Sequence, residues 1–510
     1  MTDIMNDINN SIRRPSLPCR YRSGNRSIIP HQIELIYMKK TRKVNLREES
    51  FNILRNIEKQ DAYVGDVLDG ALRRMQFCDK KERAFITRLV EGVIERRISL
   101  DFLIDKFSKK KAKVSDTNKL YDRQKDVRML LRMGIYQIRY MESVPAHAAI
   151  SETVELAKKL KYTAESGYIN AVLRKVSEAY AEGKLDSYLV SRMDTRYSTP
   201  KWLCDFLVQT YGKEKATGIL QDQFEEHQTV IRVNTLKTDV DTLRNSFIEA
   251  GVTVSEGLLY KNALRISDYD MIKRLPGYSE GEFIVQDETS CYAVNSIGIK
   301  PGDKILDLCA SPGGKSLLAY ELAYPGTVIS CDISREKLDR IAENAQRLGI
   351  DSCNITSVEE LYNNTDIKKD FSVLINDATK LNKAIASLPE EDKFDVVIAD
   401  VPCSGLGIMG RKNDIKYHTT PDAMEQLAQQ GLKILINASH YVKKGGRIGF
   451  STCTINPGED QEVVRKFLDY YNETTESDEK KGKIEIIDEK AFLQGIDGSD
   501  GFYYAVLELM

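Results

Sequence analysis

The chain lacks the features that mark membrane, secreted and metal-binding proteins. Its apolar runs are too short for a membrane-spanning helix, and its first residues lack the apolar stretch of a secretory signal. The nine cysteines are odd in number and include no Cys-x-x-Cys pair, which argues against a disulfide framework or a zinc cluster. The five histidines show no metal-ligand spacing. We therefore expect a cytoplasmic protein without a membrane segment or a metal, whose cysteines serve packing or chemistry.

An excess of charge of either sign is also missing. Among 510 residues, 74 lysines and arginines nearly balance 76 aspartates and glutamates, which gives a formal net charge of -2. This balance does not by itself indicate nucleic-acid binding, so a basic surface for RNA has to be local. The hydrophobic share of 42% is ordinary for a globular chain. The length predicts about three domains.

The N-terminal part of the sequence divides into a tail and a helical domain. Residues 1–45 are polar and basic without a helical period, and we interpret them as a disordered basic tail. The alternatives are an RNA-touching arm, or a start codon assigned before a natural start at Met38. From 46 to 184, apolar residues recur at helical spacing with almost no strand-like run, which predicts an all-helical domain. Asp101 and Ser151 are expected to cap two of its helices.

After the helical domain the pattern becomes mixed and then alternating. Residues 185–280 are interpreted as a small α+β module, with a strand at 229–234 and a helix at 239–250. In 281–510, apolar strands alternate with helices, which predicts an α/β domain built on a parallel sheet. Its strands are expected at 304–308, 327–332, 371–375, 395–400 and 446–451.

The first polar motif of the α/β domain follows its first strand, at the edge where sites in parallel sheets lie. Residues 307–316 read Asp-Leu-Cys-Ala-Ser-Pro-Gly-Gly-Lys-Ser, which predicts a strand end, a glycine turn and a helix start that can approach a ligand closely. The last three residues resemble a P-loop. A P-loop needs glycine where Cys309 stands, so a nucleotide triphosphatase is disfavoured.

An aspartate ends the second strand of the domain. Asp332 is placed to accept hydrogen bonds from ribose hydroxyls, and together with the glycine turn it indicates an adenosine ligand. A cap for the helix that starts at Ser334 is the alternative role for this carboxylate. Both roles can hold at once.

Two cysteines follow the last two predicted strands. Residues 400–407 read Asp-Val-Pro-Cys-Ser-Gly-Leu-Gly and contain Cys403, and residues 450–454 read Phe-Ser-Thr-Cys-Thr and contain Cys453. Because the ends of these strands can be neighbours in a parallel sheet, both cysteines and Asp400 can converge beside the ligand. The ordinary role of a cysteine is packing as a small hydrophobe, which we expect of Cys78, Cys204, Cys291, Cys331 and Cys353.

Such a convergence suits methylation at carbon 5 of cytosine. C5 is a poor nucleophile, and addition of a thiolate to C6 makes it enamine-like and able to take a methyl group. A protonated or hydrogen-bonding acid near N3 and N4 stabilises the adduct, and a base then removes the C5 proton before the cysteine leaves. The target base has to be unstacked to reach such a pocket.

The motifs around Cys309, Cys403 and Cys453 resemble those of the RNA cytosine-5 methyltransferases. That family pairs a cysteine in a Pro-Cys motif with a second cysteine in a Thr-Cys motif. DNA cytosine-5 methyltransferases use the Pro-Cys cysteine as nucleophile, so the presence of both motifs favours RNA. The resemblance implies a Rossmann-like class I domain that takes its methyl group from S-adenosylmethionine.

The N-terminal half resembles a NusB-like RNA-binding domain. Residues 81–85 (Lys-Glu-Arg-Ala-Phe), 145–150 and 170–174 carry this likeness. A NusB-like domain joined to such a catalytic domain is typical of Sun-type bacterial 16S ribosomal RNA methyltransferases. The resemblance implies that small-subunit ribosomal RNA is the substrate, that 185–280 serves RNA recognition, and that the chain acts as a monomer.

The same resemblance assigns roles to single residues. It makes Cys453 the nucleophile, Cys403 the residue that assists product release, and Asp400 a contact to both cofactor and cytosine. Asp332 would hold the ribose of the cofactor, and Asp377 its adenine. The methionine part of the cofactor would be surrounded by Cys309, Ala310, Ser311, Pro312, Gly313, Gly314 and Lys315, of which Lys315 also joins the catalytic group.

Further segments match or depart from the family pattern. Residues 232–234 and 286–288 match segments near the RNA and cofactor entrance. Ser311 and Ser316 replace the usual alanine and threonine, and Gly410 stands where arginine is frequent, which alters an RNA contact. Two other classes of function are weighed against RNA methylation. A non-catalytic RNA-binding assembly factor is disfavoured by the intact motifs, and a DNA cytosine-5 methyltransferase by the Thr-Cys motif and the RNA-type helical domain.

Overall fold

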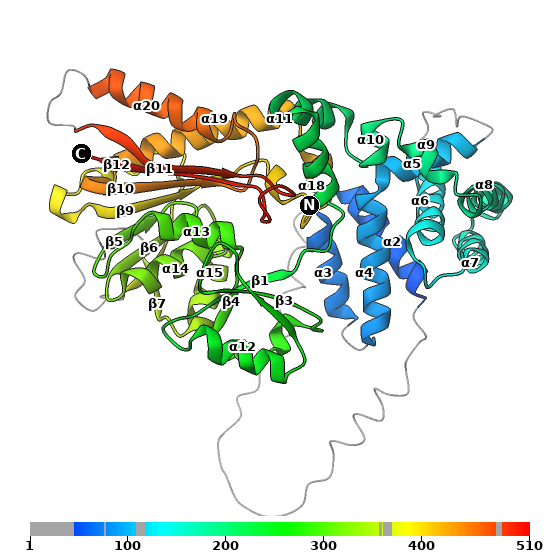
Figure 1. The fold of residues 1–510 in the computed structure, drawn as a ribbon, viewed down its shortest axis with the longest axis horizontal. Helices are drawn as coiled ribbons and strands as arrows, with labels where there is room; N and C mark the ends of the chain where they lie inside the picture. The colour runs from blue at the N-terminus through cyan, green and yellow to red at the C-terminus, as the bar shows by residue number, and fades with distance from the viewer. Residues whose placement is uncertain (1–44, 76–77, 109–117, 356–359, 361–369, 476–481) are drawn as a thin grey trace, which may run out of the picture. The chain divides into compact units, whose positions relative to one another are not determined.

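The computed structural model describes residues 45–75, 78–108, 118–355, 360, 370–475 and 482–510 (Figure 1). Residues Leu46–Met510 form one compact unit. The basic tail predicted for 1–45 lies outside the described residues, apart from Asn45.

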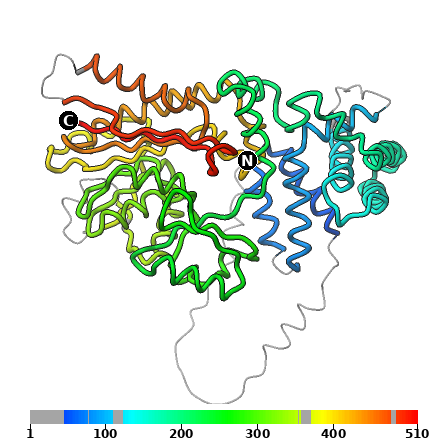
Figure 2. The backbone as a smooth tube through the Cα atoms, in the orientation of Figure 1, coloured from blue at the N-terminus to red at the C-terminus, as the bar shows by residue number. Residues whose placement is uncertain are grey.

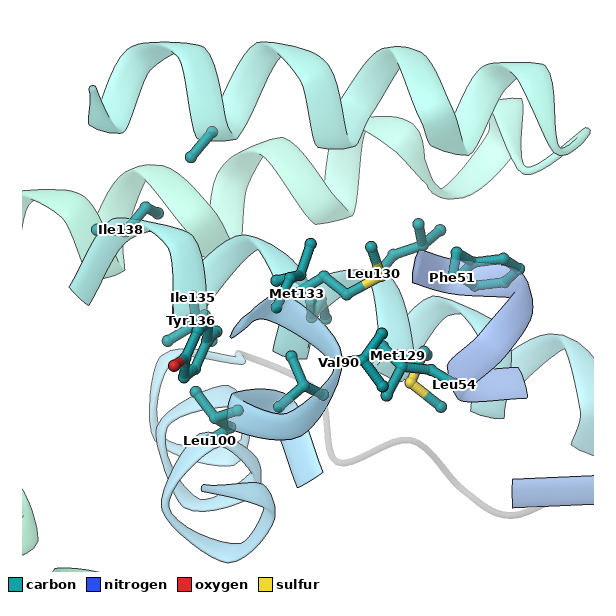
Figure 3. Close-up of a cluster of buried hydrophobic side chains, with 14 of the residues drawn as sticks. Phe51, Leu54, Val90, Leu100, Met129, Leu130, Met133, Ile135, Tyr136 and Ile138 are labelled. Carbon is teal, nitrogen blue, oxygen red and sulfur yellow. The ribbon is translucent and has the colours of Figure 1, made fainter. Parts of the chain in front are cut away.

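The N-terminal part of the larger unit is helical, as the spacing of its apolar residues predicts. Phe51, Leu54 and Leu130 are buried in one core that neighbouring helices share (Figure 3). Residues three and four positions apart lie on one helix face, so each helix buries one stripe. The helices are α2 (Leu46–Gln60), α3 (Val64–Arg74), α4 (Lys80–Glu95), α5 (Arg97–Phe107), α6 (Asn118–Tyr140), α7 (Ala146–Lys159), α8 (Thr163–Ala181) and α9 (Leu185–Leu189).

The two N-caps predicted in this domain are wrong. Asp101 lies inside α5 and Ser151 inside α7. The Asp101 carboxylate instead accepts hydrogen bonds from Arg128 at 2.7 Å and from Arg132 at 2.8 Å. An acidic residue early in an apolar stripe has the same local pattern as a cap, and only the packing of α5 on α6 reveals the ion pairs.

A linker and a small antiparallel sheet follow. The sheet has the order β2-β3-β1-β4, with the helix α12 beginning where the Asp239 side chain accepts from the amide of Thr242. The predicted strand at 229–234 and helix at 239–250 are both found within one residue of their ends. The elements are α10 (Met193–Arg196), α11 (Lys201–Asp222), β1 (Thr229–Val233), α12 (Val240–Glu249), β2 (Thr253–Glu256), β3 (Ala263–Ser267), η1 (Ile272–Arg274) and β4 (Phe283–Val285).

The C-terminal part is built on an eight-stranded sheet of order β11-β12-β10-β9-β5-β6-β8-β7. Strands β10 through β7 in this order pair in parallel, and β12 and β11 add an antiparallel pair at one end. Figure 2 follows the red C-terminal strands beside the orange β10. The strands are β5 (Lys304–Asp307), β6 (Thr327–Asp332), β7 (Ser352–Ile355), β8 (Phe371–Ile375), β9 (Phe394–Asp400), β10 (Val442–Thr452), β11 (Ile484–Phe492) and β12 (Phe502–Leu509).

The five predicted strands all lie in this sheet, and the helices cover both of its faces. Ile305 packs in the core with α13, α14 and α15, and its neighbour Leu306 packs in the core with α19 and α20. Strands buried on both faces are expected to be continuously apolar, which is why they stood out in the sequence. The helices are α13 (Glu288–Ser296), α14 (Gly314–Ala323), α15 (Arg335–Leu348), α17 (Lys383–Ala386), α18 (Ile415–His418), α19 (Pro421–Ser439) and α20 (Gln461–Thr475), with 3-10 turns η3 (Glu390–Asp392) and η4 (Leu406–Ile408). Within the described residues, every helix is too short or too polar to span a lipid bilayer.

The segment after β9 joins the sheet to the helical domain. Asp414 accepts a hydrogen bond from the amide of Val64 at 2.6 Å. The Lys416 ammonium is fully buried and lies 3.0 Å from the carbonyl oxygen of Glu95 and 2.6 Å from Oε1 of Gln223. Burial lowers the pKa of Lys416 to about 7, against the charge of Glu95 and with help from Arg96 and Arg97. The helical domain therefore holds the segment that carries the Pro-Cys motif.

Replacing Gly92 by alanine tests the packing of the helical core. The new Cβ would lie 1.9 Å from Cζ of Tyr136, so α4 and α6 have to separate. We expect the free energy of unfolding to fall by about 1–3 kcal/mol. Gly167→Ala is the matched control, because its Cβ would meet nothing within 4 Å. Chemical denaturation should show it stabilised by about 0.5–1 kcal/mol, as alanine favours a helix interior. A Gly92→Ala chain as stable as the wild type would contradict this packing.

Replacing Lys416 by methionine tests the buried amine. A lysine pKa near 7 in the folded state, against about 10.4 in the unfolded state, means that the unfolded chain binds more protons between these values. Stability contributed through this group therefore rises with pH across that window. Between pH 7 and about 8.5, we expect the melting temperature of Lys416→Met to rise less than that of the wild type. The pH range ends at about 8.5 because most cysteine thiols ionise above it. Equal slopes would contradict the assignment.

Candidate active site

The glycine turn after β5 is tightly packed against its neighbours. Gly313 has a φ of 105°, a left-handed conformation that favours glycine, and it directly precedes α14. A Cβ on Gly314 would lie 3.2 Å from Cδ of Gln286. The two glycines leave the start of α14 without a Cβ, so a ligand could approach its backbone amide groups closely. Amide groups at the start of a helix favour a negatively charged ligand group.

A buried carboxylate ties this turn to its helix. Ser316 donates to Oδ2 of Asp307 at 2.6 Å, and the amide of Cys309 lies 3.3 Å from the other oxygen. Burial raises the pKa of Asp307 to about 7, although the Ser316 hydrogen bond opposes the shift. Asp307 is fully buried and so supports the turn from behind.

Asp332 ends β6 and reaches back to the same turn. Its Oδ2 accepts from the amide of Ser311 at 3.0 Å, and its Oδ1 lies 3.0 Å from the ammonium of Lys337. The cap of α15 is Ser334, whose hydroxyl accepts from the amide of Lys337, so the alternative role of Asp332 as the cap is wrong. One carboxylate thus links the ends of two neighbouring strands.

The ends of β6 and β8 carry features that the sequence analysis missed. Ile333, which follows β6, and Ile375, the last residue of β8, are 58% and 54% exposed, although both strands are otherwise almost entirely buried. The side-chain amide nitrogen of Asn376 is buried and has no hydrogen-bond partner among the described residues. Exposed apolar side chains beside an unpaired donor fit a flat heterocycle that carries acceptors. Their only signal in the sequence is that each lies at a strand end.

Asp377 follows these residues. Its Oδ1 accepts from the Thr379 amide at 3.1 Å and from the Thr379 hydroxyl at 2.6 Å, and Lys380 pairs with its other oxygen at 2.9 Å. Hydrogen bonds from these two residues hold the pKa of Asp377 below its ordinary value. The carboxylate is therefore ionised at neutral pH and lies at the same edge of the sheet as Asp332.

Asp400 joins the glycine turn to the last two parallel strands. Its Oδ2 lies 2.7 Å from the ammonium of Lys315, and its Oδ1 accepts from the hydroxyl of Ser451 at 2.7 Å. Burial opposes a charge on Lys315, but the ion pair with Asp400 leaves the pKa of Lys315 above its ordinary value. A charged pair is therefore held beside the ends of β9 and β10.

The two cysteines meet at this point. Cys403 and Cys453, 50 residues apart in the chain, have their sulfur atoms 3.4 Å apart. The hydrogen bond from Cys403 lowers the pKa of Cys453, against the effects of burial and of the negative charge of Asp400 and with help from the positive charges of Lys315 and Lys412. The same hydrogen bond and burial raise the pKa of Cys403. The pair therefore favours a thiolate on Cys453 and a proton on Cys403.

The remaining cysteines have packing roles to different degrees. Cys204, Cys291 and Cys331 are buried, as predicted, while Cys78 is only half-buried. The side chain of Cys353 lies outside the described residues.

The segments expected near an entrance are mostly buried. Arg232 is fully buried, donates to Oε1 of Gln286 at 2.8 Å and forms an ion pair with Glu321, so it supports the turn from behind. At Gly410, a Cβ would lie 2.3 Å from Nε2 of His227. The imidazole thus fills the space that a larger side chain in this backbone conformation would need.

Comparisons with known proteins agree with this architecture. Three family models match the chain: the 16S rRNA methyltransferase RsmB/F over residues 295–508, the NusB family over 44–178, and the RsmF/B-like ferredoxin-like domain over 199–271.

Curated relatives match most of the chain. A probable ribosomal RNA small subunit methyltransferase B of Bacillus subtilis is 31% identical over 84% of this chain and 89% of its own length. The ribosomal RNA small subunit methyltransferase B of Escherichia coli is 28% identical over 92% of this chain and 99% of its own length.

Solved structures share the fold. A structure entitled PH0851 has a TM-score of 0.70 and 20% identity, and the match covers 91% of this chain and 99% of that one. NSun6 from Pyrococcus horikoshii has a TM-score of 0.50 and 19% identity, with 61% and 98% covered. On the strength of the curated relatives, the chain belongs to the RsmB/F family of 16S ribosomal RNA methyltransferases, which use S-adenosylmethionine as methyl donor.

Proposed function

We propose that the chain methylates C5 of a cytosine in small-subunit ribosomal RNA, with Cys453 as the covalent nucleophile. The observation that carries this proposal is the 3.4 Å contact between the sulfur atoms of Cys403 and Cys453. Two thiols that share a hydrogen bond beside an aspartate–lysine pair supply a nucleophile, a second proton-transfer group and charge stabilisation in one place.

The first step uses the low pKa of Cys453. Its thiolate adds to C6 of the unstacked cytosine, and the electrons of the C5–C6 double bond move toward the N3 side of the ring. The ammonium of Lys315, held 2.7 Å from Asp400, stabilises the negative charge that develops there. S-adenosylmethionine, when bound, supplies the methyl group that C5 then takes.

The second step uses Cys403. The C5 proton has to leave before the bond between C6 and the Cys453 sulfur breaks. The negative charge of Cys453 is one cause of the raised pKa of Cys403. Adduct formation removes that charge, so Cys403 releases its own proton to water more easily, and the thiolate that results then accepts the C5 proton. This order of events supports a role for Cys403 in product release.

The cofactor is assigned to the edge formed by β5, β6 and β8. The turn from Cys309 to Lys315 would surround its methionine part, Asp332 its ribose and Asp377 its adenine. Ile333 and Ile375 are exposed and suited to flank the flat ring, and the unpaired amide nitrogen of Asn376 suits a ring acceptor.

The domains divide the remaining work. We assign RNA binding to the helical domain at 46–184 and RNA recognition to the module at 185–280, and catalysis to 281–510. A monomer is proposed because one chain contributes both cysteines and Asp400. A reducing compartment such as the cytoplasm is proposed because all cysteines of the described residues are free.

Substitution of the two cysteines tests the roles assigned to them. We expect Cys453→Ala to lose methyl transfer to unmodified 16S RNA, because no thiolate remains to attack C6. We expect Cys403→Ala to accumulate a protein–RNA adduct that survives denaturing electrophoresis, because release is blocked. Transfer from labelled S-adenosylmethionine measures the first effect and a gel shift the second.

Cys78→Ala is the control for loss of a half-buried thiol, and it should keep wild-type activity. Full activity in Cys453→Ala would overturn the assignment and make Cys403 the nucleophile. RNA binding without transfer by the wild type would favour the assembly factor instead. Transfer to DNA alone would favour a DNA methyltransferase.

Substitution of Asp332 by asparagine tests the cofactor assignment. Loss of a charged acceptor for the ribose should raise the Kd for S-adenosylhomocysteine by about 10- to 100-fold. Asp339→Asn, on the exposed face of the neighbouring helix, should leave this Kd unchanged. Isothermal titration calorimetry measures both values. An unchanged Kd in Asp332→Asn would place the ribose elsewhere.

A further inference from the structure

A carboxylate lies buried behind the two cysteines. Glu459, in the turn between β10 and α20, is 2% exposed. Burial raises its pKa, while hydrogen bonds from Ser404, Asn456 and Thr454 oppose the shift. A buried carboxylate is costly unless donors surround it, so its position calls for a physical reason.

The contacts of Glu459 reach both cysteine loops. Its Oε1 accepts from the amide of Ser404 at 2.7 Å, and its Oε2 accepts from the hydroxyl of Ser404 at 2.6 Å. The same Oε2 lies 3.4 Å from the hydroxyl of Thr454 and 3.0 Å from the side-chain amide of Asn456. The hydroxyls of Ser404 and Thr454 are themselves 2.7 Å apart.

The contacts of Glu459 reach the residue that directly follows each cysteine. Ser404 directly follows Cys403, and Thr454 directly follows Cys453. One further bond joins the loops, from the amide of Gly407 to the carbonyl of Cys453 at 3.1 Å. Among the side chains that make these contacts between the two loops, that of Glu459 is the ionisable one. Its carboxylate contacts Ser404 and Thr454.

We propose that Glu459 is a positioning residue that sets the distance between the two thiols by holding Ser404 and Thr454 together. The proposal rests on the proposed two-cysteine chemistry and adds to it the group that makes the pair possible.

A neighbouring carboxylate shows why Glu459 differs from an ordinary structural link. Asp460 is equally buried, but its hydrogen bond goes to Thr452, on the same strand end as Cys453. Asp460 therefore links the end of β10 to the start of α20. Glu459 bridges the two loops, so its loss should change the geometry between the thiols more than the fold.

The test compares Glu459→Gln and Glu459→Ala in the full chain. The glutamine keeps the volume and one carbonyl acceptor, and the alanine removes all four contacts. We expect kcat for methyl transfer to fall by about 10- to 100-fold in Glu459→Ala, with an intermediate loss in Glu459→Gln, because small misplacements of reacting groups cost rate. KM for S-adenosylmethionine and the Kd for S-adenosylhomocysteine should stay at wild-type values.

A second readout measures the thiol geometry without using activity. Diamide oxidises two adjacent thiols to a disulfide and is itself reduced, and peptide mapping identifies the Cys403–Cys453 link. We expect this link to form more slowly in Glu459→Gln than in the wild type, and most slowly in Glu459→Ala. Glu462→Gln, exposed at the start of α20, is the control and should match the wild type in every measurement.

The outcomes separate the two proposals. Wild-type kcat in Glu459→Ala, or an unchanged rate of disulfide formation, would overturn the role of Glu459. If Glu459→Ala does not fold, the same criteria apply to Glu459→Gln. Full transfer by Cys453→Ala would instead overturn the proposed function, and the oxidation rates would still report whether Glu459 positions the thiols.

Discussion

The parallel pairing of β9 with β10 is the constraint on which the active site depends. It places Asp400 opposite Ser451, so that the two segments leave the sheet side by side. The amide of Val401 donates to the carbonyl of Ser451 at 3.0 Å and continues the ladder to the sheet edge. Two loops that start from one register can bring Cys403 and Cys453 to 3.4 Å. A shift of one residue would turn the side chains to the opposite face.

The surroundings give two identical side chains opposite tendencies to ionise. The hydrogen bond from Cys403 favours a thiolate on Cys453, with help from the ammonium of Lys315 and against the charge of Asp400. The same hydrogen bond and burial disfavour a thiolate on Cys403, and the charge of Glu459 adds to this effect. Each charge is held by a short contact to a strand end or a loop. The chemistry therefore needs only a few charged groups. Each of them has to lie beside the correct thiol, which requires a rigid scaffold.

The helical domain takes part in this scaffold and does more than extend the chain. Asp414 and Lys416, a short way past Cys403 in the chain, bond to α3 and to the end of α4, and Tyr417 reaches the carbonyl of Ser198. Burying an ammonium between domains is costly unless acceptors surround it. These contacts link the helical domain to the segment that follows the Pro-Cys motif.

The helical domain, the five parallel strands and the polar motifs at their ends could be predicted from the sequence, because apolar periodicity and strand-end position are local properties. The sequence analysis was wrong on Asp101 and Ser151, since a cap and an ion pair look alike along the chain, and it missed the strands β7, β11 and β12. The folded structure was needed to show that the two sulfur atoms are in contact, why Arg232 is buried, and that Glu459 spans two loops, because these depend on contacts between residues far apart in the chain.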